Sequence, residues 1–351
     1  ECLGIFNQSM VYAVDITEKL IKEFYMQKKI IALAIASALT VPAVAMADSV
    51  GNVAMYGQVN VSADRVNHGQ ATNSTNSNDL VNNSSRLGVK GGEDLGGLTG
   101  LFKAEGTIDI AAGAFNFDRK AYLGVSSADM GTALAGRHDS AYKLSTRSLD
   151  LFEDSHAADN RGLIGTGHDV YRNNSLNYMS PSMGGFSVNA AVAKAQTATE
   201  GASVSLAGMY GMDGMYATLA YDKTKAPTAA GTATKAIKLG GSYAIDAFKV
   251  NAVVEKLTST VTLGDTTGTN LYLGGQYSLS DMDAVKLAYA KRGDTKFGGA
   301  TTTNNAKQVS LGYDHGMSKR TSVYGLYTKV TDNTALAADP STVSVGMKHS
   351  F

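Results

Sequence analysis

The C-terminal segment of the chain alternates strictly between two sets of side chains and ends on an aromatic residue, Phe351. Successive side chains of a β-strand point to opposite faces, so this alternation predicts a strand that runs to the last residue. One face carries Val343, Val345, Met347, His349 and Phe351, and the other carries Thr342, Ser344, Gly346, Lys348 and Ser350. Such a strand calls for an apolar environment on one side only.

The same two-residue period recurs along most of the chain. In the segment 52–62, for example, Val53 and Met55 share one face, and Gln58 and Asn60 share the other. Sixteen segments are candidate strands: 52–62, 84–91, 98–110, 119–126, 132–138, 174–180, 185–193, 203–211, 214–222, 236–245, 247–257, 269–279, 283–292, 306–314, 320–330 and 342–351. A soluble β-sandwich would also alternate, so the period alone does not identify a membrane barrel.

The connections between these segments alternate in length, which distinguishes a membrane barrel from a soluble β-sandwich. Tight links at 181–184, 212–213, 246 and 280–282 interleave with long polar loops at 64–83, 223–234, 293–305 and 331–341. An up-and-down barrel requires short turns at one end and long loops at the other, whereas a Greek-key sandwich has no such rule. We therefore predict an all-β fold, a transmembrane antiparallel β-barrel of 16 strands.

Two further features agree with a barrel. No stretch of about 20 apolar residues follows residue 47, which argues against a helical membrane protein. Aromatic pairs flank several proposed turns and are candidates for the girdles at the two membrane interfaces, although ordinary β-propensity also explains them. These pairs are Tyr210 with Tyr216, Tyr243 with Phe248, and Tyr313 with Tyr324.

The N-terminal region is typical of an export signal. Residues 26–29 are Met-Gln-Lys-Lys, residues 30–44 are apolar, and residues 45–47 form the small-x-small site Ala-Met-Ala. The apolar stretch has about 15 residues, fewer than the roughly 20 that a spanning helix needs. We predict a signal peptide at 26–47, cleavage before Asp48, and one barrel domain at 48–351. Residues 1–25 are interpreted as an over-called upstream segment.

Composition narrows the classes of function. Lys and Arg together number 31, as do Asp and Glu, so the formal net charge is zero and gives no reason to expect a nucleic-acid partner. The single cysteine, Cys2, lies in the upstream segment, so the exported domain is not a disulfide scaffold. The sequence has no H-E-x-x-H, P-loop or G-x-S-x-G motif, and its six histidines lack ligand spacing. We expect no enzymatic activity, no cofactor and no metal.

Several short motifs lie in order along the whole exported domain: Met-Tyr-Gly at 55–57, the run at 84–96, and the segments at 118–124, 172–178, 183–186, 311–313 and 318–321. Together they resemble the general diffusion porin family of Gram-negative outer membranes. The last motif is Gly-x-x-His-x-Phe at 346–351, which resembles one branch of that family. The terminal aromatic Phe351 also resembles the signal by which outer-membrane barrels are recognised for assembly.

This resemblance implies a function and a set of partners. The protein would be a homotrimer in the outer membrane of a Gram-negative bacterium, surrounded by outer-membrane lipids. Small hydrophilic solutes and ions would diffuse passively through each barrel. The C-terminal strand would be read by the barrel assembly machinery, with Phe351 as the assembly signal.

The resemblance also implies a charged constriction, where a third long loop folds into the lumen and the low-dielectric walls focus the field of the lining charges. Here the longest connection is the third long one, 139–171. The wall arginines of the family correspond to Arg86, Arg119 and Arg172, and the candidate loop acids are Glu153, Asp154 and Asp159. Other possible lumen charges are Arg65, Lys90, Lys103, Glu105, Asp109 and Arg137. Their balance leaves the sign of ion selectivity open.

Strand parity tests these assignments in part. Arg86 shares a face with Gly88 and Lys90, which agrees with an inward position. If Arg119 points inward, Lys120 falls on the lipid face and has to snorkel to the interface. Arg172 has the parity of the apolar face, so its inward placement needs a bulge or a position at the strand end.

Two other functions fit the same sequence. A substrate-specific channel would share the fold and bind one solute along an aromatic or basic track. A structural or adhesive barrel would use its loops as a receptor surface and need no open pore. A soluble exported β-protein is a third alternative, but it gives no reason for the terminal aromatic residue.

Overall fold

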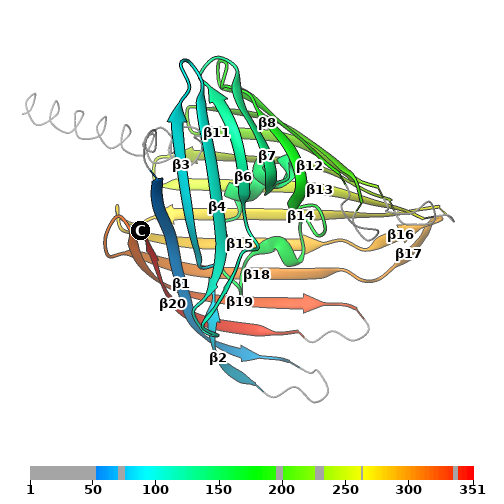
Figure 1. The fold of residues 1–351 in the computed structure, drawn as a ribbon. Coiled ribbons are helices and arrows are strands. Elements are labelled where there is room, and N and C mark those ends of the chain that lie inside the picture. The colour runs from blue at the N-terminus through cyan, green and yellow to red at the C-terminus, as the bar shows by residue number, and fades with distance from the viewer. Residues whose placement is uncertain (1–52, 70–75, 195–200, 226–232, 262–263, 335–338) are drawn as a thin grey trace, which may run out of the picture.

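The computed structural model describes residues 53–69, 76–194, 201–225, 233–261, 264–334 and 339–351. The predicted signal peptide and the upstream segment lie outside these residues. Within them, the strands form a single sheet in which every pairing between strands is antiparallel, and the pairing of the first strand with the last closes the sheet (Figure 1). No helix in this described part of the chain is both long enough and apolar enough to cross a membrane.

Sixteen strands build the barrel. Their bounds are β1 (Val53–Asn67), β3 (Arg86–Asp94), β4 (Thr99–Asp109), β6 (Ala121–Ser127), β7 (Gly131–Asp139), β8 (Tyr171–Met179), β9 (Phe186–Ala193), β10 (Ser203–Met212), β11 (Met215–Thr224), β12 (Ala233–Ile245), β13 (Phe248–Val261), β14 (Gly264–Ser278), β15 (Asp283–Arg292), β18 (Ala306–Gly316), β19 (Thr321–Asp332) and β20 (Ser341–Ser350). Four short strands extend the hairpins: β2 (Ser77–Asn82), β5 (Ala114–Asn116), β16 (Thr295–Phe297) and β17 (Ala300–Thr302).

The predicted fold is therefore confirmed. The strands differ from the expected ones mainly by extending further into the loops, as where β1 runs to Asn67 instead of 62. The short turns also have the expected chemistry. Asp213 and Gly214 both have positive φ, 50° and 78°, which is the conformation that a two-residue hairpin turn requires.

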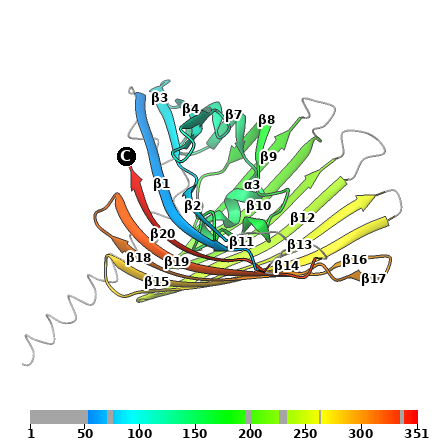
Figure 2. The ribbon, with the colours of Figure 1, turned by 90° about the horizontal axis from the view of Figure 1, so that it is seen from below.

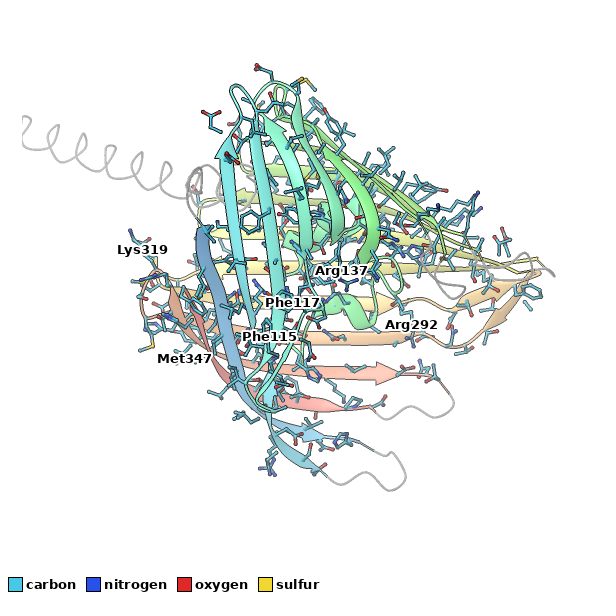
Figure 3. The ribbon with its side chains drawn as sticks, in the orientation of Figure 1. Phe115, Phe117, Arg137, Arg292, Lys319 and Met347 are labelled. Carbon is cyan, nitrogen blue, oxygen red and sulfur yellow. The ribbon has the colours of Figure 1, made fainter. Side chains whose placement is uncertain are left out.

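Burial alternates along the strands as the sequence predicted. In β11, Thr218 is 3% exposed and points into the barrel, whereas the next residue, Leu219, is 59% exposed and points outward. Met347, labelled in Figure 3, belongs to the same outer face. The barrel thus has an apolar outer surface that lipid can cover and a polar interior.

The barrel closes at Phe351. The residue's N–H donates to the carbonyl of Gly57 at 3.1 Å, and its carbonyl accepts from the N–H of Gly57 at 3.0 Å. Its ring lies over Gly57, where a Cβ would come within 2.4 Å of the ring edge. The terminal aromatic residue therefore continues the pairing of β20 with β1 by one residue beyond the strand.

One connection folds into the barrel instead of extending above it. This inward loop, residues 140–170, contains α3 (Ala141–Thr146) and the 3-10 turns η1 (Arg147–Leu149) and η2 (Asn160–Gly162). Ser140 caps α3 by accepting from the N–H of Lys143 at 3.0 Å. Figure 2 shows α3 inside the curve of the sheet. The main apolar core is formed between this loop and the wall: Leu149, Leu151, Phe152, Leu163 and Ile164 of the loop pack with Tyr216, Val253, Tyr272, Ala288, Ala290 and Leu326.

The aromatic girdle differs from the expected pairs at two positions. Tyr216 and Tyr324 point inward, where Tyr216 donates to the carbonyl of Ser145 and Tyr324 donates to Asn60. Both were assigned to the girdle because they lie close to turns, but their parity places them on the lumen face. The outward aromatic residues near the short turns are Phe186, Tyr210, Tyr243, Phe248, Tyr277 and Tyr313.

Candidate functional site

The inward loop divides the lumen and leaves a cavity between itself and the part of the wall made by β1, β3, β4 and β6–β11. The cavity has a volume of about 1330 Å³. Seven basic and five acidic side chains line it: Arg86, Lys103, Arg119, Lys120, Lys143, Arg147 and Arg161, with Glu105, Asp139, Glu153, Asp154 and Asp213. Charged groups of both signs therefore surround the narrowed part of the lumen.

The wall and the loop meet directly at Arg86 and Asp154. Nη1 of Arg86 lies 2.8 Å from Oδ2 of Asp154, and Nη2 donates to Gln58. Asp154 has a φ of 67°, a left-handed conformation that aspartate tolerates better than most residues. Burial alone would raise the pKa of Asp154, but the charge and hydrogen bond of Arg86, with Arg147, lower it to about 2. The carboxylate is therefore ionised at neutral pH.

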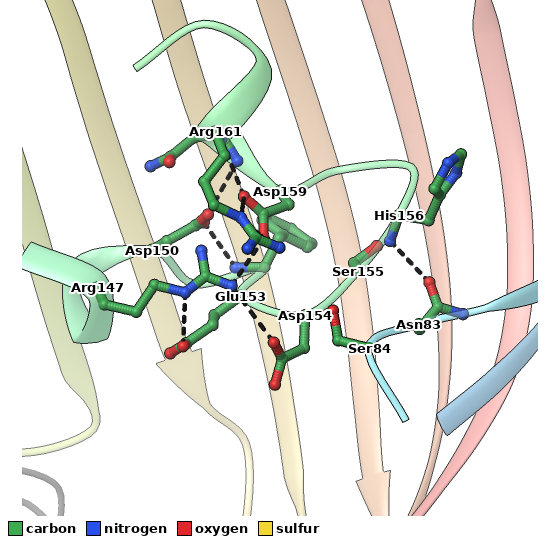
Figure 4. A network of polar contacts seen from close by, with 12 residues as sticks. Asn83, Ser84, Arg147, Asp150, Glu153, Asp154, Ser155, His156, Asp159 and Arg161 are labelled. Atoms are coloured by element: carbon green, nitrogen blue, oxygen red, sulfur yellow. Dashed lines mark hydrogen bonds and ion pairs between the residues drawn. The ribbon is translucent and has the colours of Figure 1, made fainter. Parts of the chain in front are cut away.

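Arg147 is the centre of the loop's own charge network, shown in Figure 4. Its guanidinium lies 2.7 Å from Glu153, 2.8 Å from Asp159 and 3.4 Å from Asp154. Asp159 also pairs with Arg161 at 2.8 Å. Burial lowers the pKa of Arg147, but the charges of Glu153 and Asp159 outweigh it and the net shift is upward. All three predicted loop acids are thus partnered by one arginine of the same loop.

Arg147 was not among the predicted site residues, because the loop was expected to supply acids that face arginines of the wall. The available signal was a single basic residue shortly before the run of acids at 150–159, but no local rule predicts that this stretch folds back upon itself. The loop folds back on itself around Asp150, because the carboxylate of this residue accepts from the N–H groups of Phe152 and Asn160, both at 2.9 Å.

Arg119 pairs with an acid of the wall instead of the loop. Its Nε lies 2.8 Å from Glu105 of β4, which also accepts from Tyr56 at 2.7 Å and lies 3.4 Å from Lys103. Two of the other possible lumen charges, Lys103 and Glu105, are therefore placed in the cavity beside Arg119.

The expected position of Lys120 on the lipid face is wrong. Its Nζ lies 2.8 Å from Asp139, and both residues line the cavity. The reason is that β6 starts at Ala121, so Arg119 precedes the strand and does not follow its parity. Lys143 binds the other oxygen of Asp139 at 2.7 Å and lies 3.8 Å from the centre of the Tyr171 ring.

Arg172 points inward through an irregularity of the kind that its parity required. The pairing of β7 with β8 shifts register between Gly136 and His138, and Asn174 has a φ of 46°. Arg172 then reaches β11, where it donates to Asp222 at 2.9 Å and to Thr224 at 3.0 Å. His168 of the inward loop contacts the same Asp222 oxygen at 2.7 Å.

The remaining four predicted charges have different positions. Lys90 lies on the lumen face, with its Nζ 5.7 Å from the centre of the Tyr56 ring. Arg65 is placed on the outer face of β1, opposite Val343, because it has the parity of Val53 and Met55. Asp109 accepts from the N–H groups of residues 111 and 112 and so shapes a hairpin tip. Arg137 lies at the bulge and donates to main-chain carbonyls at 118 and 119.

A second set of buried polar contacts fastens the inward loop to β12–β14. Glu255 of β13 is fully buried and accepts from the hydroxyl of Tyr142 at 2.5 Å and from the N–H of Gly165 at 2.9 Å. Asn270 donates to the same carboxylate at 2.7 Å. Next to it, Nζ of Lys238 lies 2.7 Å from Asp169 of the loop. The loop is therefore held at both of its ends.

We expect the Glu255→Ala change to loosen the inward loop at both of its ends, near Tyr142 and near Gly165. It leaves three buried donors without their acceptor, at a cost of about 1–3 kcal/mol each. Because cleavage of a locally opened segment follows its population, a cost of about 3 kcal/mol predicts a roughly 100-fold faster trypsin cleavage after Arg161. Glu93→Ala, at the exposed end of β3, is the matched control. Equal cleavage rates in the wild type and Glu255→Ala would contradict the anchoring role.

The comparisons with known proteins identify the class. A sequence model of Gram-negative porins matches residues 32–335. Outer membrane porin protein 32 of Delftia acidovorans is 30% identical over 93% of this chain and all of its own length. The anion-selective porin from Comamonas acidovorans has a TM-score of 0.75 at 26% identity, covering 86% of this chain and 99% of the other. The major outer membrane protein P.IB of Neisseria lactamica is 25% identical over 93% of this chain and all of its own length.

A closed transmembrane barrel with a loop folded into its lumen defines an outer-membrane channel. The chain belongs to the Gram-negative porin family. Its place in the outer membrane, predicted from the sequence, is confirmed by this membership.

Proposed function

We propose that the protein is a general diffusion porin with a weak preference for anions. Small hydrophilic solutes and ions pass through the water-filled cavity beside the inward loop. The observation that carries the proposal is the charge of that cavity, which is lined by seven basic and five acidic side chains among the residues that the structure describes. A surplus of positive charge in a narrow passage lowers the energy of an anion there relative to a cation.

The pairing of the loop acids supports the sign of this preference. Glu153, Asp154 and Asp159 each lie within 3 Å of an arginine guanidinium. At the distance of a passing ion, the field of each of these carboxylates is largely cancelled by the arginine beside it. On the wall, Glu105 is shared by Arg119 and Lys103, and Asp139 is shared by two lysines. A structural relative described as anion-selective is in agreement.

We also propose how the protein assembles in the outer membrane. A homotrimer is expected from membership of the porin family, as is recognition of the C-terminal strand by the barrel assembly machinery. The apolar outer face and the outward aromatic residues fit a surface in contact with membrane lipids and neighbouring subunits.

Planar-bilayer recording of the purified protein tests this function. We expect large conductance steps in groups of three, with a step size that rises with salt concentration without saturating. Across a salt gradient, we expect the sign of the reversal potential to show that anions pass more readily than cations. The preference is expected to weaken as salt rises from 0.1 to 1 M, because the Debye length falls from about 10 to about 3 Å. Conductance that saturates with one solute would favour a substrate-specific channel. Correctly folded barrels that conduct nothing would favour a structural or adhesive role.

A further inference from the structure

The inward loop has two faces within one short stretch of sequence. Arg147, Ser148, Glu153 and Asp154 line the cavity, whereas Leu149, Leu151 and Phe152, which lie between them, are buried against the wall. The positions of the cavity-lining side chains therefore depend on how closely the buried ones approach the wall.

Three glycines of the wall lie beneath these buried side chains. They are Gly240 in β12, Gly274 in β14 and Gly312 in β18. A Cβ on Gly240 would lie 2.8 Å from Cδ1 of Leu149 and 2.9 Å from Cγ2 of Thr146, and one on Gly312 would lie 2.7 Å from Cε1 of Phe152. One on Gly274 would lie 2.9 Å from the hydroxyl of Tyr272 on the wall and 3.1 Å from Cδ1 of Leu151. Carbon atoms in van der Waals contact are about 3.5–4.0 Å apart. The loop thus occupies the space that a side chain would need.

Backbone conformation does not explain these glycines. None of the three is among the residues with positive φ, so an L-residue could adopt the local backbone without strain. They also share the lumen face, since each pairs across the sheet with a lumen-facing residue: Val253, Ala288 or Leu326. Glycine at these positions provides space for the loop.

We propose that Gly240, Gly274 and Gly312 form a glycine seat that sets the depth of the inward loop and thereby the width of the diffusion path. This inference rests on the proposed function, because it requires that solutes pass through the cavity beside the loop. The residues that control pore size then lie on the side of the loop that faces away from the passage.

The surroundings determine which way the loop moves when the seat is filled. On the wall side, the side chain of Asn251 donates to the carbonyl of Leu149 at 2.7 Å, and the N–H of Leu151 donates to Tyr272 at 2.9 Å. The buried side chains are enclosed in a core, which is close-packed and resists added volume. The opposite side of the loop faces water. An added methyl group is therefore relieved by displacement of the loop into the cavity.

The experiment compares alanine at the seat with alanine at neighbouring outward-facing glycines. Gly240→Ala and Gly312→Ala are expected to lower single-channel conductance and to exclude smaller polyethylene glycols than the wild type does, because each new methyl group first meets a side chain of the loop. The reversal potential is expected to change little, because no charge is altered. Gly275→Ala and Gly325→Ala are the matched controls, since a Cβ at either position meets nothing within 4 Å. These controls should conduct like the wild type.

A compensating variant separates loop position from general damage to the barrel. Gly312→Ala combined with Phe152→Leu removes part of the ring that the new methyl group meets, and is expected to restore conductance toward that of the wild type. If Gly312→Ala does not assemble, Gly240→Ala with Leu149→Ala is measured in the same way. Heat-resistant oligomers of the seat variants with wild-type conductance and exclusion size would overturn the inference. A wild type without conductance would instead refute the proposed function.

Discussion

Neutralising Arg86, Arg119 and Arg147 together is expected to convert the channel from a preference for anions to a preference for cations. The triple change to glutamine leaves four basic side chains against five acidic ones in the cavity. It also releases the acids that these arginines neutralise, because Asp154 loses both of its partners and Glu105 loses the closer of its two bases. The newly unpaired carboxylates face the passage.

The expected size of the effect follows from Coulomb's law. Three unit charges at about 8 Å from a passing ion in water change its energy by roughly 1.5 kcal/mol in total, in opposite directions for anions and cations. Screening at 0.1 M salt reduces this by about half, which leaves roughly a tenfold change in the ratio of anion to cation permeability. The reversal potential across a salt gradient measures this ratio directly.

Two controls make this result specific. Arg65→Gln removes a charge from the outer face of β1 and should leave the reversal potential unchanged. Arg147→Gln alone should move the potential toward cations, although Arg147 is part of the loop and not of the wall. An unchanged potential in the triple variant, with conductance retained, would show that these residues do not control selectivity.

Deletion of Phe351 is expected to abolish most of the heat-resistant oligomer. The deletion removes two main-chain hydrogen bonds to Gly57, each worth about 1 kcal/mol net in water, and the ring that covers this glycine. The loss is greater in a membrane, where unpaired strand edges have no water to bind. Electrophoresis without heating, after expression in outer membranes, gives the yield of assembled protein.

Phe351→Tyr is the matched control for this deletion. It keeps an aromatic ring over Gly57 and both main-chain hydrogen bonds, so assembly should remain close to that of the wild type. Gly57→Ala tests the partner surface, since a Cβ would meet the ring at 2.4 Å and the carbonyl of Arg86 at 2.6 Å. A normal yield of oligomer after the deletion would argue against the role of the last residue in closing the barrel.

The strands and their two faces could be predicted from sequence because both depend on local information. A period of two decides which side chains share a face, and turn residues mark the hairpins. The same rule failed where the chain leaves the strand. Lys120 was placed on the wrong face because β6 starts at Ala121, two residues later than predicted. Tyr216 was assigned to the girdle from its distance to a turn, although its parity is that of the lumen.

The candidate site was predictable only in part. The resemblance to porins indicated Arg86 and Asp154, and the structure brings these two residues within 2.8 Å. It did not indicate that Arg119 pairs with Glu105, or that Arg147 partners the loop acids. These pairs form between segments that lie side by side only after the loop has folded into the barrel.

The barrel, its strand number and the direction of its faces could be predicted from the chain alone, since hydrophobic period and loop length are local properties. The entry of the third long loop into the lumen was implied by the resemblance to porins. Where that loop lies, and which charges remain for a passing ion, became known from the folded barrel. The loop's depth depends on glycines and buried polar groups contributed by β12, β13, β14 and β18, far from it in sequence. The net field in the passage is a sum over these contacts, and so it exists only in the folded barrel.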